Sequence, residues 1–522
     1  MTDAAEYDRI YKKEGKETEM LPIVNVQTMQ SCDRATIESG TPSRELMLRA
    51  AKGILASHTW QGKTLIVCGT GNNAGDGYAL ATLMQEKELS CELLLLYDRF
   101  SPDGEYYFTL CRQKGIAHTV WSGSFDFSCY NQIVDCIFGI GFRGTPDQAT
   151  AALIEAINES GKTVISADIN SGLGGDNGVG TPCIKSDLTV AVQSYKPGHF
   201  LAMAKDVIKN HTCIDIGIQM TNENIYLLEE TDVADLFLPR KNHSHKGNYG
   251  YVAVMGGSVE YAGATKLANM SAAALRAGCG VVTLAVPASI VNSVSPHLLE
   301  STLLPIPAGA DGKMLYTPQI LDGILARYAS IAVGMGWGSA KTYEEILSHL
   351  LKNAKQPLII DADGLNTLAK MDLSILKDAK APVILTPHLM EFSRLSGLSI
   401  EQIEADPISC AKAFAKEYGV ILLLKGCCTA VTDGEVVYLC NRGGAGMATA
   451  GSGDVLAGIL AGLCGYLPAN ALTVAAGAYL AGIAGELAQE NAGAVSMLAS
   501  DTVGQISSAI KVLTHSHKYL KK

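Results

Sequence analysis

Short apolar segments alternate with glycine-containing turns and helix-like stretches along most of this 522-residue chain. The segments are continuous runs of Val, Ile and Leu, which is typical of parallel strands buried on both faces. Parallel neighbours need long crossover connections, and helices usually supply them. The pattern therefore predicts an α/β fold with doubly wound sheets. Expected strands fall at 64–69, 91–97, 132–138, 162–168, 187–192, 249–257, 280–286, 330–336, 357–363, 382–387 and 420–426.

A polar connector at 221–245 interrupts this series once, so we expect two domains, at 21–225 and 226–522. The first 20 residues are polar and of mixed charge, and we expect a flexible extension there rather than a signal peptide. The run at 435–440 indicates one arm of a short antiparallel pair. The two halves are not repeats of one another.

Composition excludes several classes of function. The net charge of −11 argues against a nucleic-acid partner. The 14 cysteines contain no C-x-x-C pair, which favours free thiols in a reducing compartment, the cytoplasm. The uncharged stretch 455–483 is divided by Pro468 into pieces too short to span a bilayer. We therefore expect two core helices there and no membrane partner.

Polar side chains follow several strands of the first half. The turn GTGNNAGDG (69–77) has the spacing G-x-G-x-x-x-G, which differs from the dinucleotide fingerprint. Asn73, Asp135 and Ser171 lie at three strand ends, and the carboxyl ends of such strands are where open α/β sheets bind ligands. Their hard oxygens suit an alkali or alkaline-earth cation rather than zinc. Taken singly, each residue could equally serve in an Asx turn or a cap.

The second half contains the glycine-rich segment GMATAGSGDVL (446–456). Glycines and a helix start offer backbone N–H groups to a phosphate. An acid in that place suits proton removal from a hydroxyl that attacks the phosphate, and Asp454 is that acid. A plain helix cap is the alternative. Other strand-end loops contain Asp361, Asp363, Asn366, His388, Glu391 and the lysine of KGCCT (425–429).

The segments NNAGDG, DCIFGIGFRGT, SADINSGL and YKPGH resemble the YjeF N-terminal family of NAD(P)HX repair proteins. The resemblance implies a Rossmann-like domain that epimerises hydrated NAD(P)H beside a potassium ion, with Asp168 catalytic. Ala74 departs from the usual NNGGDG. It further implies K⁺ at Asn73, Asp135 and Ser171, and substrate at Asn72, Asn73, Ala74, Gly75, Asp76, Gly139, Ile140, Gly141, Phe142, Arg143, Gly144, Thr145 and Asp168.

The segments TPHLMEF, KGCCT and GSGD resemble the ADP- or ATP-dependent NAD(P)HX dehydratases, which are relatives of the ribokinase-like kinases. The resemblance implies a ribokinase-like sandwich that binds Mg²⁺ with the nucleotide, with Asp454 catalytic. Gly444-Ala445 departs from the usual NPGMAT. It further implies substrate at Ala264, Gly336, His388 and Asp454, and ADP at Lys425, Gly426, Cys427, Cys428, Thr429 and Gly453.

Together the resemblances predict a repair enzyme that epimerises R- and S-NAD(P)HX and dehydrates the S form, with ADP converted to AMP and phosphate. Fusion with an epimerase favours ADP over ATP, and we expect a homo-oligomer. The alternative is a vitamin or sugar kinase with a non-catalytic N-terminal nucleotide-binding module. A second alternative makes the first domain a binding scaffold. The polar set Asn73, Asp135, Asp168 and Ser171 favours catalysis.

Overall fold

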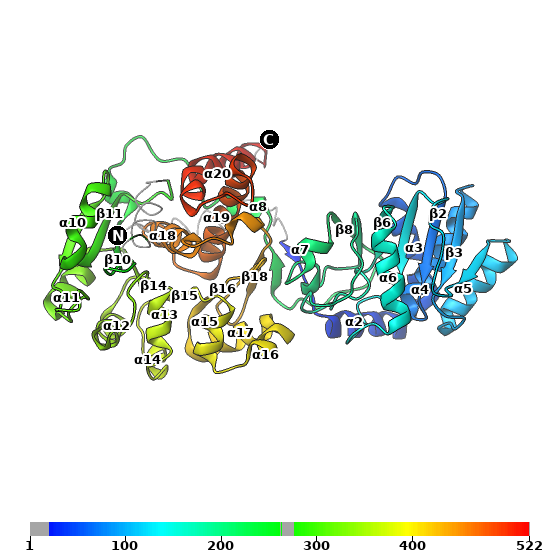
Figure 1. The fold of residues 1–522 in the computed structure, drawn as a ribbon, viewed down its shortest axis with the longest axis horizontal. Coiled ribbons are helices and arrows are strands. Elements are labelled where there is room, and N and C mark those ends of the chain that lie inside the picture. The colour runs from blue at the N-terminus through cyan, green and yellow to red at the C-terminus, as the bar shows by residue number, and fades with distance from the viewer. Residues whose placement is uncertain (1–19, 262, 264–275, 521–522) are drawn as a thin grey trace.

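A computed structural model describes residues 20–261, 263 and 276–520. Two α/β units lie end to end, each built on its own sheet (Figure 1). The predicted α/β fold class is confirmed: an all-parallel sheet comes first, and a mixed sheet with helices on both faces comes second. Residues 1–19 of the predicted extension, and Ala264, lie outside the described residues.

The first unit has seven parallel strands in the order β4-β3-β2-β5-β6-β7-β8. Successive side chains of a strand point to opposite faces, so Ile66 packs under α3, α4 and α5 while Leu65 packs under α6. The elements are β2 (Thr64–Cys68), β3 (Cys91–Leu95), β4 (His118–Val120), β5 (Gln132–Cys136), β6 (Thr163–Ala167), β7 (Leu188–Val192), β8 (His211–Ile214), α2 (Val26–Glu38), α3 (Ser43–Ala56), α4 (Asn72–Glu86), α5 (Pro102–Gln113), α6 (Gln148–Glu159), η1 (Pro197–His199) and α7 (Ala204–Val207).

Two features of this unit differ from the sequence prediction. The strands β4 and β8 were not predicted, because both are short and contain polar residues. Helix α4 begins at Asn72 rather than at Tyr78, so the glycine-rich segment forms its first turns and not a loop. Packing explains this: a Cβ on Gly75 would lie 2.6 Å from Met47 Sδ, and one on Gly77 would lie 3.0 Å from Cys136 Sγ. The methyl of Ala74 is buried in the same cluster.

The second unit has an eleven-stranded mixed sheet in the order β1-β9-β18-β17-β16-β15-β14-β13-β10-β11-β12. Its central strands are parallel, and β16-β17-β18 is antiparallel, which confirms the predicted arm at 435–440. The strands are β1 (Leu21–Pro22), β9 (Ile225–Leu227), β10 (Tyr251–Met255), β11 (Val281–Pro287), β12 (Thr302–Ile306), β13 (Ser330–Val333), β14 (Leu358–Ile360), β15 (Val383–Leu385), β16 (Ile421–Leu424), β17 (Thr429–Thr432) and β18 (Val437–Cys440).

Helices cover both faces of this sheet (Figure 1). On β10, Val252 faces the layer of α18, α19 and α20, whereas Ala253 faces the layer of α11 to α17. The helices are α8 (Glu230–Ala234), α10 (Val291–Val294), α11 (Pro318–Arg327), α12 (Lys341–Asn353), α13 (Asp363–Leu368), α14 (Ser374–Lys377), α15 (Leu389–Ser396), α16 (Ile400–Ala405), α17 (Pro407–Tyr418), α18 (Ser452–Cys464), α19 (Ala471–Ala492) and α20 (Ala499–Leu520), with short 3₁₀ turns η2 (Lys246–Tyr249), η3 (Ala288–Ile290), η4 (Ser295–His297) and η5 (Ala445–Met447).

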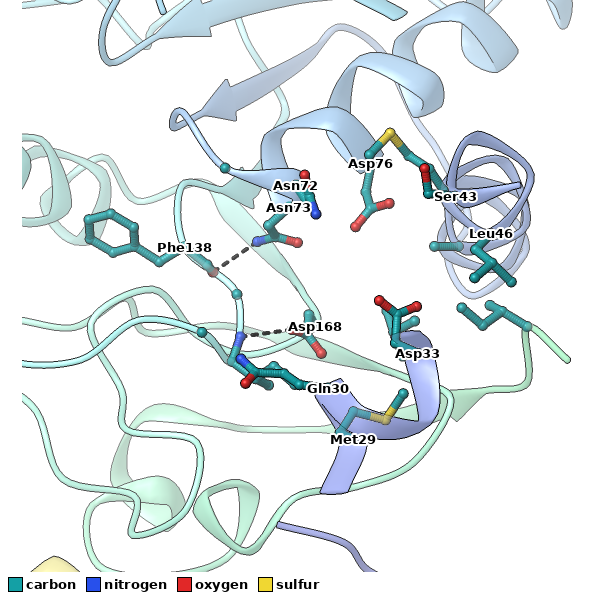
Figure 2. A pocket seen from close by; sticks show the side chains of 18 of the residues that line it. Met29, Gln30, Asp33, Ser43, Leu46, Asn72, Asn73, Asp76, Phe138 and Asp168 are labelled. Carbon is teal, nitrogen blue, oxygen red and sulfur yellow. Dashed lines mark hydrogen bonds between the residues drawn. The ribbon is translucent and has the colours of Figure 1, made fainter. Parts of the chain in front are cut away.

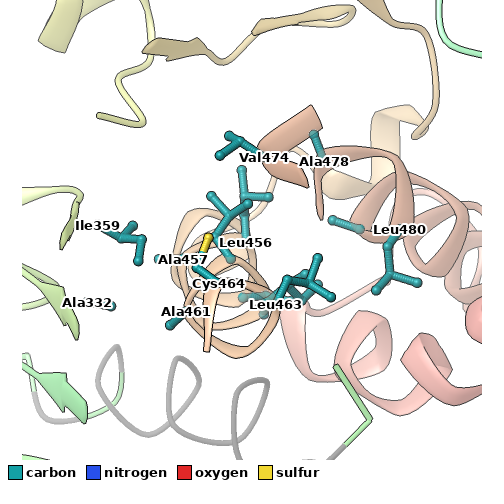
Figure 3. Packing of buried hydrophobic residues seen from close by; sticks show 14 of the residues in the cluster. Ala332, Ile359, Leu456, Ala457, Ala461, Leu463, Cys464, Val474, Ala478 and Leu480 are labelled. Carbon is teal, nitrogen blue, oxygen red and sulfur yellow. The ribbon is translucent and has the colours of Figure 1, made fainter. Parts of the chain in front are cut away.

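Helix α18 runs between the sheet and α19 (Figure 3). Its Ala457 and Ala461 pack in one cluster with Ile359 of the sheet and Val474 of α19, and such small side chains allow close approach. Helix α19 is apolar and long enough to cross a membrane, but 83% of its most apolar window is buried. The predicted pair of core helices in 455–483 is therefore confirmed.

The two units share an interface. Strand β1, from the start of the first unit, pairs with β9, which pairs in turn with β18. One apolar cluster joins Phe200 of the first unit to Cys428 and Leu439 of the second. We keep the boundary near residue 225 as a proposal, with β9 lying in the second sheet. All fourteen cysteines are free.

Candidate functional site

A cavity of about 490 Å³ opens at the carboxyl ends of β2, β5 and β6, between them and helices α2 and α3 (Figure 2). The structure brings eight of the predicted substrate-binding residues to its wall. Ala74 and Gly75 are buried behind them and do not line it. Arg143, Gly144 and Thr145 also lie outside the lining. The eight are Asn72, Asn73, Asp76, Gly139, Ile140, Gly141, Phe142 and Asp168.

Asp168 is held from several sides. Lys196 Nζ donates to its Oδ1 at 2.9 Å, and the backbone N–H of Ile140 donates to Oδ2 at 2.8 Å. Its φ of 65° is rare for a residue with a side chain, and such strain is typical of functional sites. His199 Nε2 donates to its carbonyl at 2.8 Å and helps fix that backbone. The result is a carboxylate fixed at the cavity wall.

The electrostatics of this group favour the charged carboxylate. Burial would raise the Asp168 pKa, but the charge of Lys196 and the Ile140 hydrogen bond lower it below its ordinary value. Lys196 is only 1% exposed, so the ion pair is largely shielded from solvent. Burial, followed by the Lys196 charge, lowers the His199 pKa to about 4. His199 is therefore neutral at pH 7.

Asn73 and the Asp135–Ser171 pair meet at the Phe138 carbonyl beside the cavity. Asn73 Nδ2 donates to the Phe138 carbonyl at 2.8 Å, while its buried Oδ1 has no hydrogen-bond partner in the described structure. Ser171 Oγ lies 2.5 Å from Asp135 Oδ1 and 3.2 Å from the Phe138 oxygen. Burial raises the pKa of Asp135, and hydrogen bonds from Ser171 oppose that rise. The unpartnered oxygen and its neighbours fit a hard alkali or alkaline-earth cation.

Sequence reasoning missed two side chains of this site, Lys196 and Asp33. Lys196 lies in the quoted YKPGH segment, just after strand β7, and that position was the available signal. Asp33 on α2 and Asp76 on α4 face each other across the cavity, near Asp168 (Figure 2). Burial raises the pKa of Asp76, and the charges of Asp168 and Asp33 raise it further; burial alone raises that of Asp33. Nothing in the sequence around Asp33 indicated this position.

The second site lies at the carboxyl ends of β14, β15 and β16. Lys425 Nζ donates to Asp361 Oδ1 at 2.9 Å and lies 3.8 Å from Glu391 Oε2. A Cβ on Gly453 would be 3.3 Å from Lys425 Nζ, so the start of α18 adjoins this pair. The strand ends thus gather the predicted lysine with Gly453 and with two acids that had no assigned role.

Asp454 lies in the first turn of α18, at its N-terminal end. The pKa of Asp454 is raised to about 7. Burial is the largest cause, and the negative charges of Asp361 and Asp363 raise the pKa further, whereas the positive charge of Lys425 lowers it. A carboxyl group that titrates near neutral pH suits general base catalysis. For Lys425, burial would lower the pKa, but Asp361 and Glu391 raise it.

The other residues predicted for the dehydratase site differ in what they contact. His388 caps α15, accepting from Met390 N and Glu391 N through Nδ1, and Gly336 adopts φ 66° after β13. Cys428 packs into the apolar cluster between the two units, and Cys427 Sγ donates to the Ala202 carbonyl, so their side chains face the interface. Within the 425–429 loop these two can offer a nucleotide only backbone groups.

The loop before Asp454 is fixed despite its departure from the family pattern. Gly446 N donates to Gln489 Oε1 at 2.8 Å, and a Cβ on Gly444 would lie 2.4 Å from the same oxygen. Glycine at 444 therefore lets α19 hold the loop directly. The segment Ala445–Met447 forms a 3₁₀ turn.

Comparisons with known proteins match each unit separately. Residues 43–198 match the family described as YjeF-related protein N-terminus, and 252–508 match NAD(P)H-hydrate dehydratase. The bifunctional NAD(P)H-hydrate repair enzyme of Moorella thermoacetica is 33% identical over 92% of this chain and 94% of its own length. Its namesake in Escherichia coli is 30% identical over 88% and 87%.

Among solved structures, one similar chain is the ADP/ATP-dependent NAD(P)H-hydrate dehydratase of Bacillus subtilis, co-crystallised with ATP and Mg²⁺. It is 27% identical, with a TM-score of 0.47, and the match covers 55% of this chain and 97% of that one.

We predict that Lys196→Met destabilises the first unit by about 3–5 kcal/mol at pH 7, because it leaves a buried charge unpaired. The pKa of Asp168 is lower in the folded protein than its value of about 3.9 in the unfolded chain. The ion pair therefore contributes its full stabilisation above about pH 3.9, and this stabilisation is lost as the pH falls through the folded-state pKa. The difference between wild type and variant should therefore shrink below about pH 4. Denaturant unfolding across pH measures it.

Lys209→Met is the matched control, because Lys209 pairs with Asp187 at 3.2 Å on the exposed surface. Its cost should stay below about 1 kcal/mol. Equal destabilisation by the two variants would contradict the importance of the buried pair.

Proposed function

This chain belongs to the family of bifunctional NAD(P)H-hydrate repair enzymes, and we propose below how its two sites perform the family's two reactions. It is an NAD(P)HX epimerase and an ADP/ATP-dependent NAD(P)HX dehydratase. The observation that carries this function is the presence of a polar site at the carboxyl edge of each sheet, one with Asp168 and one with Asp454. A kinase with an inert first domain would not need the buried Lys196–Asp168 pair at a cavity wall.

In the dehydratase site, Asp454 acts as the general base. Hydroxide is a poor leaving group, so the ring hydroxyl must first be phosphorylated. Asp454 takes the proton of the ring hydroxyl as the hydroxyl oxygen attacks the terminal phosphate of the nucleotide. The ring nitrogen's electrons then expel phosphate, which leaves with the C–O bond electrons, and loss of a proton from the neighbouring ring carbon forms the C=C bond of NAD(P)H. The backbone N–H groups of Gly453 and Asp454 at the start of α18, with Lys425, stabilise the transferring charge.

The nucleotide itself is proposed to be ADP, bound along 425–429 and at Gly453, with Mg²⁺ held mainly by its phosphates. We propose that Gly336 and His388 contact the hydrated ring of the substrate. These assignments rest on the placement of all these residues at neighbouring strand ends.

In the epimerase site, Asp168 is proposed to move the proton of the ring hydroxyl. Removing that proton lets the adjacent C–N bond open to an aldehyde, and the ring nitrogen takes up the proton. Closure on the other face reverses these steps and inverts the centre. The charged form of Asp168, maintained by Lys196, is the form able to accept the proton.

We propose K⁺ as the cation held by Asn73, Asp135 and Ser171, joined by the Phe138 carbonyl. The unpartnered Asn73 Oδ1 supports this assignment. When bound, the ion would supply positive charge that anchors the substrate's phosphates. We further propose a cytoplasmic location, because the free thiols suit a reducing compartment. The homo-oligomer expected above stays a proposal.

We expect Asp454→Asn to lower the rate of dehydration by about 10²–10⁴-fold, the range typical of a lost general base. Because the Asp454 pKa is about 7, the wild-type rate should rise with pH through that value as the carboxylate forms. The variant should lose this rise but still bind ADP and epimerise normally. Recovery of absorbance at 340 nm with S-NADHX and ADP follows the reaction, and near-normal turnover would refute the assignment.

We expect Asp168→Ala to lower the epimerisation rate by about 10²-fold or more with little change in substrate affinity, because proton transfer acts in the transition state. Given a mixture of epimers and ADP, the variant should stop after the S form is consumed and then proceed only at the spontaneous rate. Rapid, complete repair would show that Asp168 is structural.

We expect Asp135→Ala to abolish any dependence of epimerisation on K⁺ and to weaken binding of the hydrated dinucleotide to the first site. Titration with K⁺ against Na⁺ at constant ionic strength measures the dependence. Dehydration of purified S-NADHX serves as the internal control and should be unchanged. Activation by K⁺ that persists in Asp135→Ala would place the ion elsewhere.

A further inference from the structure

A second groove, of about 640 Å³, opens beside the dehydratase site at the carboxyl ends of β13 and β14. Its walls come from the loop after β13, from helix α13 and its C-terminal end, and from α15. Among the residues that line it, only Asp363 already has a role, because its charge raises the pKa of Asp454. The lining residues are Tyr261, Gly338, Ser339, Asp363, Asn366, Thr367, Ala369, Lys370 and Arg394.

Arg394 is positioned by a relay of hydrogen bonds. Its Nη1 donates to Asn366 Oδ1 at 2.9 Å, and Asn366 Nδ2 donates to Asp363 Oδ1 at 3.3 Å. The other Asp363 oxygen accepts from the backbone N–H of Gly338 at 2.7 Å. The carboxylate is thus engaged by Gly338 and Asn366, and the guanidinium is held by a neutral amide. Arg394 keeps its remaining N–H donors and its full charge for a ligand.

Two lysines converge on the neighbouring Ser339. Lys370 Nζ donates to Ser339 Oγ at 3.2 Å, and Lys313 Nζ donates to the Ser339 carbonyl at 2.7 Å. Among the described residues, none of these three cations forms an ion pair with a carboxylate. In a protein of net charge −11, three cations with neutral partners around one loop indicate a local site for an anion.

We propose that this groove binds a phosphate group of the hydrated dinucleotide, so that Arg394 and Lys370 are substrate-binding residues of the dehydratase, with the charge of Lys313 beside them at the Ser339 loop. The inference rests on the proposed function of the Asp454 site. The topology supports it: ADP is assigned to the loops around β16 and β17, whereas the groove belongs to β13 and β14, and β15 lies between them. The two phosphate-bearing molecules then reach Asp454 from opposite sides.

Two phosphates of the substrate could occupy the groove: the diphosphate bridge, which both hydrates carry, and the ribose 2′-phosphate, which only NADPHX carries. A variant that removes an Arg394 contact separates them. Loss confined to NADPHX identifies the 2′-phosphate, and equal loss for both hydrates identifies the diphosphate. Either result supports the groove as a phosphate subsite.

The experiment measures KM and kcat of the full chain with purified S-NADHX and S-NADPHX at saturating ADP. Arg394→Gln should raise KM for the recognised hydrate by about 10–100-fold, the effect of losing a charge-assisted contact, while kcat changes less than about twofold. Lys370→Ala should act in the same direction, and Arg394→Lys should recover part of the loss. The matched control is Lys377→Ala, which removes a surface charge paired with Glu417 outside the groove.

Unchanged KM for both hydrates in Arg394→Gln and in the double variant with Lys370→Ala would overturn the proposal. So would a rise in the KM for ADP instead of the hydrate, because it would assign the groove to the nucleotide. Failure of the wild type to dehydrate either hydrate would refute the proposed function itself, and is thus distinguishable from failure of the subsite.

Discussion

Each sheet of this protein ends in a buried lysine–aspartate pair, and the two sites are arranged around these pairs. Lys196 holds Asp168 in the first unit, and Lys425 holds Asp361 in the second, both at 2.9 Å. Parallel strands direct all their carboxyl ends to one edge, so charged side chains that follow different strands meet there. Neither member of such a pair can be removed without leaving the other as a buried charge. The ion pairs therefore fix the backbone of the loops that hold the ligands.

The two catalytic carboxyl groups differ because their surroundings differ. Asp168 is buried but faces a cation and a backbone donor, so its pKa is lowered. Asp454 is buried with Asp361 beside it, and Lys425 only partly offsets this, so its pKa is raised to about 7. Fixed charges thus set one carboxylate to remain ionised and the other to change its protonation near neutral pH. When nucleotide phosphates enter, Lys425 must serve both Asp361 and the added negative charge.

The sequence was most informative where one physical cause acted alone. Continuous apolar runs predicted the buried strands, and polar residues at strand ends placed Asn73, Asp135 and Ser171 at one edge of the sheet. The sequence did not predict features that depend on packing between distant segments. Helix α4, for example, begins at Asn72 because its glycines fit against Met47 and Cys136. Asp33 entered the cavity through the docking of α2, a tertiary event without a local pattern. The relay from Gly338 to Arg394 likewise exists only after the loop that follows β13 meets helices α13 and α15.

The segment 195–205 links the two sites physically. Lys196 and His199 hold Asp168 on one side, while the carbonyl of Ala202 accepts from Cys427 Sγ and Lys205 Nζ donates to the Gly443 carbonyl on the other. Cys427 belongs to the loop assigned to ADP, and Gly443 lies three residues before the start of the glycine-rich segment 446–456 that leads to Asp454. One short segment therefore supports the base of the first reaction and the nucleotide loop of the second. Its packing in the apolar cluster around Phe200 stabilises both sites at once, which gives the fusion of the two units a structural basis as well as a chemical one.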